Sequence, residues 1–212
     1  MALSPEARVL LYVPNVIGYV RLGCLLGSWW CWVEQPGWLV LLYALQAILD
    51  GVDGWAARRL RQCSSFGAWL DVVIDNVGRT MLWSLLFDWG WLVGCLEWLC
   101  FVCNSGAGGQ WKAAIIADGP PLCRWVMADG FKTRWGVLAI GGLHVLPIWL
   151  VGMRRGLFTA GGGPLGWVPA PLVWACLALL VVGRLLCALV ELWCILAHVR
   201  AMLREDATAT AK

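Results

Sequence analysis

The chain has few charged residues. Only 14% of its 212 residues are Asp, Glu, Lys or Arg, and 61% are hydrophobic, against about 25% and about 45–50% in ordinary soluble domains. The mean hydropathy of +0.74 excludes a typical soluble globular fold. The net charge of +3 is small and no basic stripe is present, so nucleic acid binding is not indicated.

The start of the chain lacks the marks of a cleaved signal peptide. Met1 to Arg8 holds no run of positive charge, and the apolar stretch that follows has Pro14, Asn15 and Arg21 but no small-residue cleavage site. We therefore expect a retained first helix.

Cysteine is plentiful, with ten residues, but most lie inside apolar runs where a thiol acts as a small hydrophobe. Cys100 and Cys103 form a C-x-x-C, which leaves a redox or metal pair as an alternative. A second Cys or His pair that would complete a zinc site is missing.

Long hydrophobic runs dominate the chain. Because a helix needs roughly 20 apolar residues to cross a bilayer, the sequence predicts an all-α integral membrane protein with six transmembrane helices. The helices are expected near 10–33, 38–58, 67–87, 91–104, 135–151 and 171–199, and the fourth can extend to Ile116. We expect one transmembrane domain, residues 1–200, and a short polar tail, residues 201–212, that frays after Glu205.

Basic residues predict the orientation of these helices. With six spans, one side carries most of them and should be cytoplasmic: Arg8, Arg58, Arg59, Arg61, Lys112, Arg124, Lys132, Arg134, Arg200, Arg204 and Lys212. Arg154 and Arg155 are exceptions. Six tryptophans fall near the opposite ends, the position of interfacial anchors: Trp29, Trp30, Trp32, Trp38, Trp89 and Trp91.

The second and third predicted helices carry four acids: Asp50, Asp53, Asp71 and Asp75. An aspartate at the centre of a membrane helix costs about 2.5–3.5 kcal/mol. Spacings of three and four place each pair on one helix face. If the helices pack side by side, four carboxylates converge and need cations to coexist. Mg²⁺ or Mn²⁺, two ions in all, are the natural partners, since they prefer oxygen ligands and two-metal sites clamp the oxygens of a displacement at phosphorus.

The residues between the acids suit a phosphate ligand. Gly54 and Ala57 remove bulk on the acidic face, Arg58 is placed to meet phosphate oxygens, and Gly67 lies one turn before Asp71. A lone Asp in a membrane helix can instead pair helices or relay protons. Four Asp residues in paired spacing favour a metal site.

These residues match the pattern D-x2-D-G-x2-A-R-x8-G-x3-D-x3-D, and the chain resembles the CDP-alcohol phosphatidyltransferases. The match comprises Asp50, Asp53, Gly54, Ala57, Arg58, Gly67, Asp71 and Asp75. The resemblance implies a transferase of phospholipid biosynthesis whose metals are held by the four acids, with Asp75 also the general base. It implies that Gly54, Ala57, Arg58 and Gly67 bind CDP-diacylglycerol, and that CMP leaves when a small alcohol attacks.

The first helix narrows the resemblance to the phosphatidylinositol synthase branch. The run from Val13 to Arg21 and the residues around Asp50 and Asp71 are similar to that branch, which implies myo-inositol as acceptor. Asn15 and Arg21 are expected to support the site, although an interfacial Asn and a snorkelling Arg remain the alternative. That branch usually has arginine directly after the final Asp, where this chain has Asn76.

The acceptor pocket is less defined. Candidate contacts are Asn76, Glu97, Asn104, Lys132, Arg134 and His144, each with an ordinary helix-end or core role as the alternative. Another acceptor, such as glycerol phosphate or serine, is the alternative chemistry. A cation-binding membrane protein or transporter is the alternative class, although inverted repeats and broken helices are not visible. The resemblance implies a multi-pass enzyme of the endoplasmic reticulum membrane with its site facing the cytoplasm, and a possible homodimer.

Overall fold

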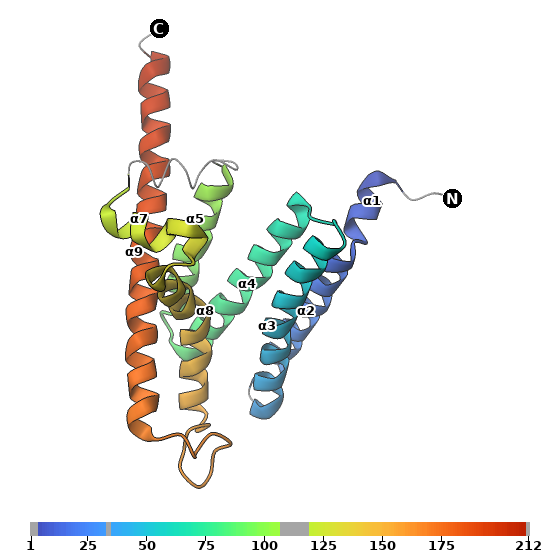
Figure 1. The fold of residues 1–212 in the computed structure, drawn as a ribbon, viewed down its shortest axis with the longest axis vertical. Coiled ribbons are helices and arrows are strands. Elements are labelled where there is room, and N and C mark those ends of the chain that lie inside the picture. The colour runs from blue at the N-terminus through green and yellow to red at the C-terminus, as the bar shows by residue number, and fades with distance from the viewer. Residues whose placement is uncertain (1–3, 33–34, 107–118, 211–212) are drawn as a thin grey trace. The chain divides into compact units, whose positions relative to one another are not determined.

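A computed structural model describes residues 4–32, 35–106 and 119–210. All regular secondary structure in this described part is helical (Figure 1). The helices are α1 (Pro5–Leu10), α2 (Val13–Trp30), α3 (Pro36–Arg59), α4 (Ser65–Leu86), α5 (Trp91–Gly106), α7 (Pro121–Phe131), α8 (Arg134–Arg154) and α9 (Ala170–Thr210). The chain divides into two compact units, Met1–Met81 and Leu82–Lys212, and each is described by itself.

The first predicted helix corresponds to α2, and a short helix that was not predicted, α1, precedes it. Ser4 caps α1 by accepting a hydrogen bond from the Ala7 amide at 3.2 Å, and α1 ends at Leu10. Pro14 stands in the first turn of α2, where its missing N–H costs nothing. A helix running through this point would lose a hydrogen bond and clash with the proline ring, so α2 begins at Val13, a few residues after the predicted start near residue 10.

Small residues set the packing in the first unit. A β-carbon at Gly18 would lie 3.0 Å from the Leu70 side chain, and one at Gly78 would lie 3.3 Å from Leu25. These glycines let α2 and α4 approach closely, as small residues do between membrane helices. Leu25 and Ile74 are almost fully buried in the resulting core.

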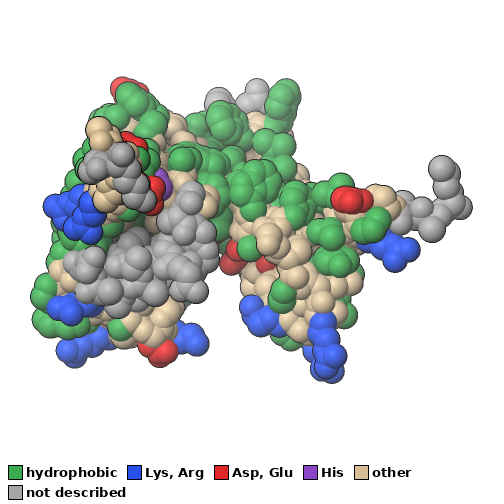
Figure 2. All heavy atoms as spheres, turned by 90° about the horizontal axis from the view of Figure 1, so that it is seen from above, with side chains coloured by type: hydrophobic (Ala, Val, Ile, Leu, Met, Phe, Trp, Pro, Cys, Tyr) green, Lys and Arg blue, Asp and Glu red, His purple; other side chains and the backbone are tan. Residues whose placement is uncertain are grey.

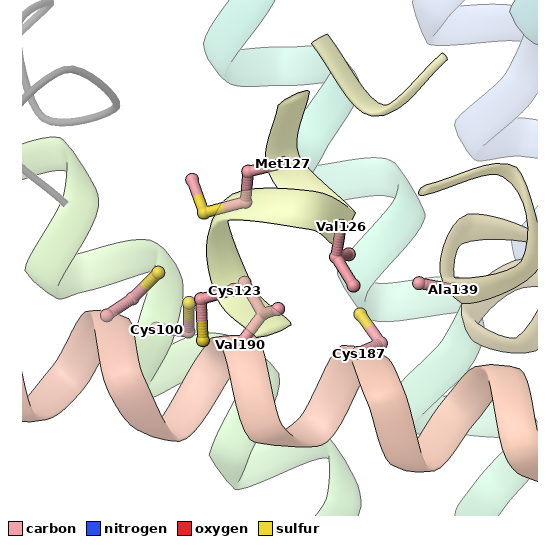
Figure 3. Close-up of a cluster of buried hydrophobic side chains, with 8 residues drawn as sticks. Cys100, Cys123, Val126, Met127, Ala139, Cys187 and Val190 are labelled. Carbon is pink, nitrogen blue, oxygen red and sulfur yellow. The ribbon is translucent and has the colours of Figure 1, made fainter. Parts of the chain in front are cut away.

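Cysteines help to form the core of the second unit. Figure 3 shows Cys100, Cys123 and Cys187 among Val126, Met127, Ala139 and Val190, at the meeting of α5, α7, α8 and α9. All ten cysteines are free thiols. Burial raises the pKa of Cys123 above its ordinary value, which keeps its sulfur protonated. Cys100 and Cys103 are both buried, so this C-x-x-C packs in a core, as expected for small hydrophobes.

Two glycines form the crossing of α8 and α9. A β-carbon at Gly142 would lie 2.1 Å from the Arg184 backbone nitrogen, and one at Gly183 would lie 2.1 Å from the Leu138 carbonyl oxygen. The backbones therefore touch where they cross. Gly90 plays a different part, because it packs against the carbonyl of Trp83 in the turn after α4.

Among the described residues, three helices are long and apolar enough to cross a membrane: Gly37–Arg59, Arg134–Arg154 and Ala170–Thr210. The stretch Trp91–Ser105 is apolar but shorter. Hydrophobic side chains cover much of the visible surface in Figure 2, and Trp30 is 89% exposed. These features indicate a membrane protein.

The last helix is longer than expected. At 41 residues, α9 has a length of about 60 Å at 1.5 Å per residue, roughly twice the hydrocarbon core of a bilayer. The expected fraying after Glu205 was wrong, since α9 continues to Thr210. Residues 211–212, and the extension of the fourth helix to Ile116, lie outside the described residues.

Arg154, an exception to the charge pattern, has a specific contact. Its Nη1 donates to the carbonyl oxygens of Leu85 at 3.2 Å and Leu86 at 2.6 Å. These are the last carbonyls of α4, which have no partner within the helix. Arg154 therefore caps the end of α4.

Candidate functional site

Four acids meet in the first unit, as their spacing predicts. Asp50 and Asp53 project from α3, and Asp71 and Asp75 project from α4. Carboxylate oxygens of Asp50, Asp53 and Asp71 all lie within 4.8 Å of one another. We call Asp50, Asp53, Asp71 and Asp75 the acid cluster.

Arg21 of α2 lies at the centre of the acid cluster. Its Nη1 is 2.6 Å from Asp53 Oδ2 and 2.6 Å from Asp71 Oδ1. Its Nη2 is 2.6 Å from Asp50 Oδ1 and 2.9 Å from Asp75 Oδ1. The arginine side chain has no exposed surface. One fixed, planar guanidinium fork thus joins all four acids, so the snorkelling alternative for Arg21 does not hold.

A second arginine reaches the acid cluster from α4 itself. Arg79 Nη1 lies 3.4 Å from Asp75 Oδ2, one helical turn away. Arg79 Nη2 donates to Asn76 Oδ1 at 2.5 Å. Asn76 is buried, and its hydrogen bond holds the Arg79 side chain in place. Arg79 was not among the predicted site residues, although an arginine four residues after an acid in an apolar helix is a usable signal.

The net charge of these side chains is negative, which attracts cations. Four carboxylates and two guanidinium groups have a formal charge of −2. Close carboxylates repel one another unless positive charge lies between them, and the Arg21 guanidinium occupies that position here. An all-oxygen donor set is what Mg²⁺ and Mn²⁺ prefer. The acid cluster therefore fits a divalent metal ion by its chemistry.

A pocket opens beside the acid cluster, with a volume of about 580 Å³ including its open mouth. Asp53 and Asp71 line one part of it. The predicted ligand-binding residues Gly54, Ala57 and Gly67 also line it, and Pro14, Asn15, Gly18, Gln62, Cys63, Ser64, Ala68 and Leu70 complete the wall. Arg58 is exposed, and its Nη1 lies 3.4 Å from where a β-carbon on Gly54 would stand.

The turn between α3 and α4 shapes this pocket. The Gln62 amide donates to the Ala57 carbonyl at 2.9 Å, and Arg61 adopts a positive φ of 56°, as in a helix-ending Schellman motif. Gln62 Oε1 then accepts from the Val13 amide at 2.9 Å. The signature residue Ala57 is thus part of the helix end that joins α3 to the start of α2.

Gly67 has a steric reason to be glycine. A β-carbon there would lie 2.7 Å from Asn15 Oδ1 and 3.1 Å from Ser64 Oγ. The Gly67 amide also donates to Ser64 Oγ at 3.0 Å, which caps the start of α4. Asn15 and Gly67 are therefore in direct contact across the pocket wall.

The sequence pattern of the family described as CDP-alcohol phosphatidyltransferase matches residues 11–118, slightly more than half of the chain. The chain belongs to this family.

Curated relatives share the same part of the chain. The CDP-diacylglycerol–inositol 3-phosphatidyltransferase of Schizosaccharomyces pombe is 34% identical over 100 residues, covering 47% of this chain and 35% of the relative. An Arabidopsis thaliana protein of that name, numbered 1, is 44% identical over 83 residues, covering 38% and 36%. The Saccharomyces cerevisiae protein is 43% identical over 79 residues, covering 37% and 36%. The chain thus spans about a third of the length of the curated relatives it matches. No solved structure matches it significantly.

The acceptor candidates of this phosphatidyltransferase-family chain lie mostly in the second unit. Lys132 follows α7 and Arg134 is the first residue of α8; both are exposed. The Arg134 guanidinium lies over the Trp135 ring, 5.3 Å from its centroid. Asn104 donates to Cys100 Sγ at 3.4 Å. His144 is half-buried on α8. Of the candidates, only Asn76 lies in the unit that holds the acid cluster.

Glu97 belongs to a second buried group of charges. Arg184 Nη2 lies 3.3 Å from Glu97 Oε1, and Arg184 Nη1 lies 2.9 Å from Glu191 Oε2. All three residues are buried. This ion triad links α5 to α9. Arg184 and Glu191, seven residues apart in an apolar run, were missed by the sequence analysis, although charge in such a run is itself a signal.

Proposed function

We propose that this chain transfers a phosphatidyl group from CDP-diacylglycerol to a polyol hydroxyl, most specifically that of myo-inositol, and releases CMP. The observation that carries the proposal is the convergence of four carboxylates around the buried guanidinium of Arg21. The carboxylates are those of Asp50, Asp53, Asp71 and Asp75. The printed names of the relatives, all CDP-diacylglycerol–inositol 3-phosphatidyltransferases, support the choice of donor and acceptor.

In the proposed reaction, the acceptor hydroxyl oxygen forms a bond to the phosphorus that carries diacylglycerol. The bond from that phosphorus to the bridging diphosphate oxygen breaks, and CMP leaves with the bond's electrons. Asp75 accepts the proton of the hydroxyl, since a neutral alcohol is a weak nucleophile. Bound Mg²⁺ or Mn²⁺, two ions in our proposal, would neutralise the diphosphate oxygens.

The chain's own residues would hold the donor for this step. Asp50, Asp53, Asp71 and Asp75 would bind the metal ions, and Arg21 would keep the carboxylates converged. Gly54, Ala57 and Gly67 leave the pocket wall open for the cytidine diphosphate. Arg58, exposed beside Gly54, would meet phosphate oxygens with its guanidinium.

We further propose six transmembrane helices, formed by α2, α3, α4, α5, α8 and α9, with the acid cluster facing the cytoplasm. Such an enzyme would work in phospholipid biosynthesis at the endoplasmic reticulum membrane, as a possible homodimer. The distribution of basic residues supports this arrangement. Soluble polyols and membrane-held CDP-diacylglycerol would meet at that face.

An acceptor panel tests the proposal. The purified full chain, in lipid nanodiscs with Mn²⁺, is incubated with CDP-diacylglycerol labelled in its diacylglycerol part and with myo-inositol, glycerol 3-phosphate or serine. We expect labelled product with myo-inositol alone. Product with another alcohol and none with myo-inositol would contradict the acceptor. No product with any alcohol would contradict the transfer itself.

A further inference from the structure

The short helix α7 has one face in the core of the second unit and one face on its surface. Cys123, Val126 and Met127 are buried, and they pack with residues of α8 and α9 in the cluster that Figure 3 shows. Arg124 and Trp125 lie on the other side of the helix, where Arg124 is exposed and Trp125 is 60% exposed. The outward face of α7 therefore presents a cation next to a large aromatic ring.

Thr133 joins this face of α7 to the start of α8. Its Oγ1 donates to the Trp125 carbonyl oxygen at 2.9 Å and accepts from the Gly136 amide at 3.1 Å. One side chain thus holds α7 against the first turn of α8. Lys132 and Arg134 stand on either side of Thr133 in the sequence, and both are exposed. The backbone that carries these two cations is therefore fixed beside α7.

Positive charge predominates where α7 meets α8. We call the exposed residues at this junction the basic corner: Arg124, Trp125, Lys132, Arg134 and Trp135. Asp129, which is also exposed, is the one acidic residue between residues 119 and 140. With three cations and one carboxylate, this segment has a formal charge of +2, so its surface should attract an anion.

The basic corner lies at the beginning of a helix that can span a membrane. Arg134 is the first residue of Arg134–Arg154, which is long and apolar enough to cross a bilayer. Trp135 is 39% exposed and Val137 is 61% exposed, so apolar surface follows the cations directly along α8. Tryptophan and basic residues are enriched where the hydrocarbon of a bilayer meets its headgroups. Lipid phosphates stand at that level.

We propose that the basic corner binds the headgroup of an anionic phospholipid from the surrounding bilayer. The lipid phosphate would accept charge-assisted hydrogen bonds from Lys132 and Arg134, and an acyl chain would pack on Trp135 and Val137. One lipid thus matches both the charged and the apolar part of the surface. A soluble phosphate or an acidic peptide would match the cations alone. The inference needs a membrane around the chain and does not rest on phosphatidyl transfer.

Native mass spectrometry of the purified full chain tests this binding. The protein in detergent is titrated with phosphatidylserine or phosphatidylcholine, and EDTA is present so that no divalent ion bridges a lipid phosphate to the acid cluster. Each cation near a membrane surface favours anionic lipid by about fivefold. We expect the wild type to bind phosphatidylserine at least about tenfold more tightly than phosphatidylcholine. The triple variant Arg124→Gln, Lys132→Gln, Arg134→Gln should lower that preference by at least about fivefold.

A second triple variant, Arg8→Gln, Arg59→Gln, Arg204→Gln, is the matched control. It removes the same charge from exposed residues outside the basic corner, and its preference should stay within about twofold of the wild type. An equal loss in the two triple variants would show attraction by overall charge and overturn the inference. A wild type that binds both lipids equally would also overturn it.

Photocrosslinking of the wild type gives a test that does not depend on how the variants fold. The full chain is placed in nanodiscs that contain phosphatidylserine with a photoreactive diazirine near its headgroup. After irradiation, the labelled peptides are identified by mass spectrometry. We expect label in residues 121–137, and label confined to other segments would overturn the inference. CMP release in matched nanodiscs tests the proposed function separately.

Discussion

Arg21 Nη1 lies 2.6 Å from Asp53 Oδ2, inside the first unit and out of reach of solvent. The same guanidinium contacts Asp50, Asp71 and Asp75. Arg21 is thus the internal counter-charge that lets α2, α3 and α4 pack with four carboxylates facing one another.

Arg21→Leu should destabilise the chain most when metal is absent. Removing one partner of a buried ion pair costs about 3–5 kcal/mol. The cost should be smaller here because Asp50 and Asp71 are half-exposed and solvent screens their charge. Divalent ions should restore part of the loss, since they bind the folded acid cluster. Thermal unfolding in nanodiscs, with EDTA or with Mn²⁺, measures both effects.

Arg21→Lys is the comparison for that experiment, because it keeps the charge but not the planar fork. It should unfold between the wild type and Arg21→Leu. Equal unfolding temperatures for all three proteins in EDTA would show that Arg21 does not hold the acid cluster together.

Asp71→Asn should weaken metal binding without unfolding the first unit. Asp71 supplies an oxygen to the group of three acids within 4.8 Å, and an amide carries no charge to attract a cation. We expect at least about a tenfold loss of Mn²⁺ affinity by electron paramagnetic resonance, since even residues behind the ligands cost about that much. Asp88→Asn, at an exposed aspartate after α4, should bind Mn²⁺ as the wild type does. Equal affinity for Asp71→Asn would remove Asp71 from the ligand set.

Gly67→Ala should disturb the pocket wall. The new β-carbon would lie 2.7 Å from Asn15 Oδ1, and Asn15 is held by its bond to Val9. Overpacking of this kind costs about 1–3 kcal/mol, seen as a lower midpoint of thermal unfolding. Gly51→Ala is the control, because a β-carbon there meets nothing within 4 Å and alanine favours a helix by about 1 kcal/mol. If both variants lowered the midpoint equally, the Asn15–Gly67 contact would not be what requires glycine.

Arg184→Leu should destabilise the second unit. It would leave Glu97 and Glu191 buried without the guanidinium that now contacts both, at a cost of about 3–5 kcal/mol. Arg204→Leu, on the exposed end of the same helix, should leave stability nearly unchanged. Denaturant unfolding in detergent compares the two, and equal stability would show that the triad does not hold α5 to α9.

The acid cluster was predictable from sequence because helical spacing is a local property. Asp50 with Asp53, and Asp71 with Asp75, had to share a face whatever the tertiary fold. Most helix limits also agreed within a few residues, since apolar runs end at Pro, Gly and charged residues. The break before α2 was missed although Pro14 marked it.

The partners of the acids were not predictable in the same way. Arg21 is 29 residues from Asp50 in the sequence, and only the packing of α2 against α3 and α4 brings them together. Glu97 was expected as an acceptor contact, whereas the structure gives it an ion pair with Arg184. That pair depends on which face of α9 meets α5, which the nearly uniform apolar sequence of α9 does not reveal.

Release of CMP by wild type and by Asp75→Asn is the most direct test of the central claim, that the acid cluster catalyses phosphatidyl transfer. Both proteins are reconstituted with CDP-diacylglycerol, Mn²⁺ and myo-inositol, and membrane insertion is checked in parallel. We expect CMP release by the wild type, dependent on myo-inositol, and a loss of at least about 100-fold in Asp75→Asn, within the range that proton transfer contributes. An inserted Asp75→Asn protein that releases CMP at the wild-type rate would contradict it.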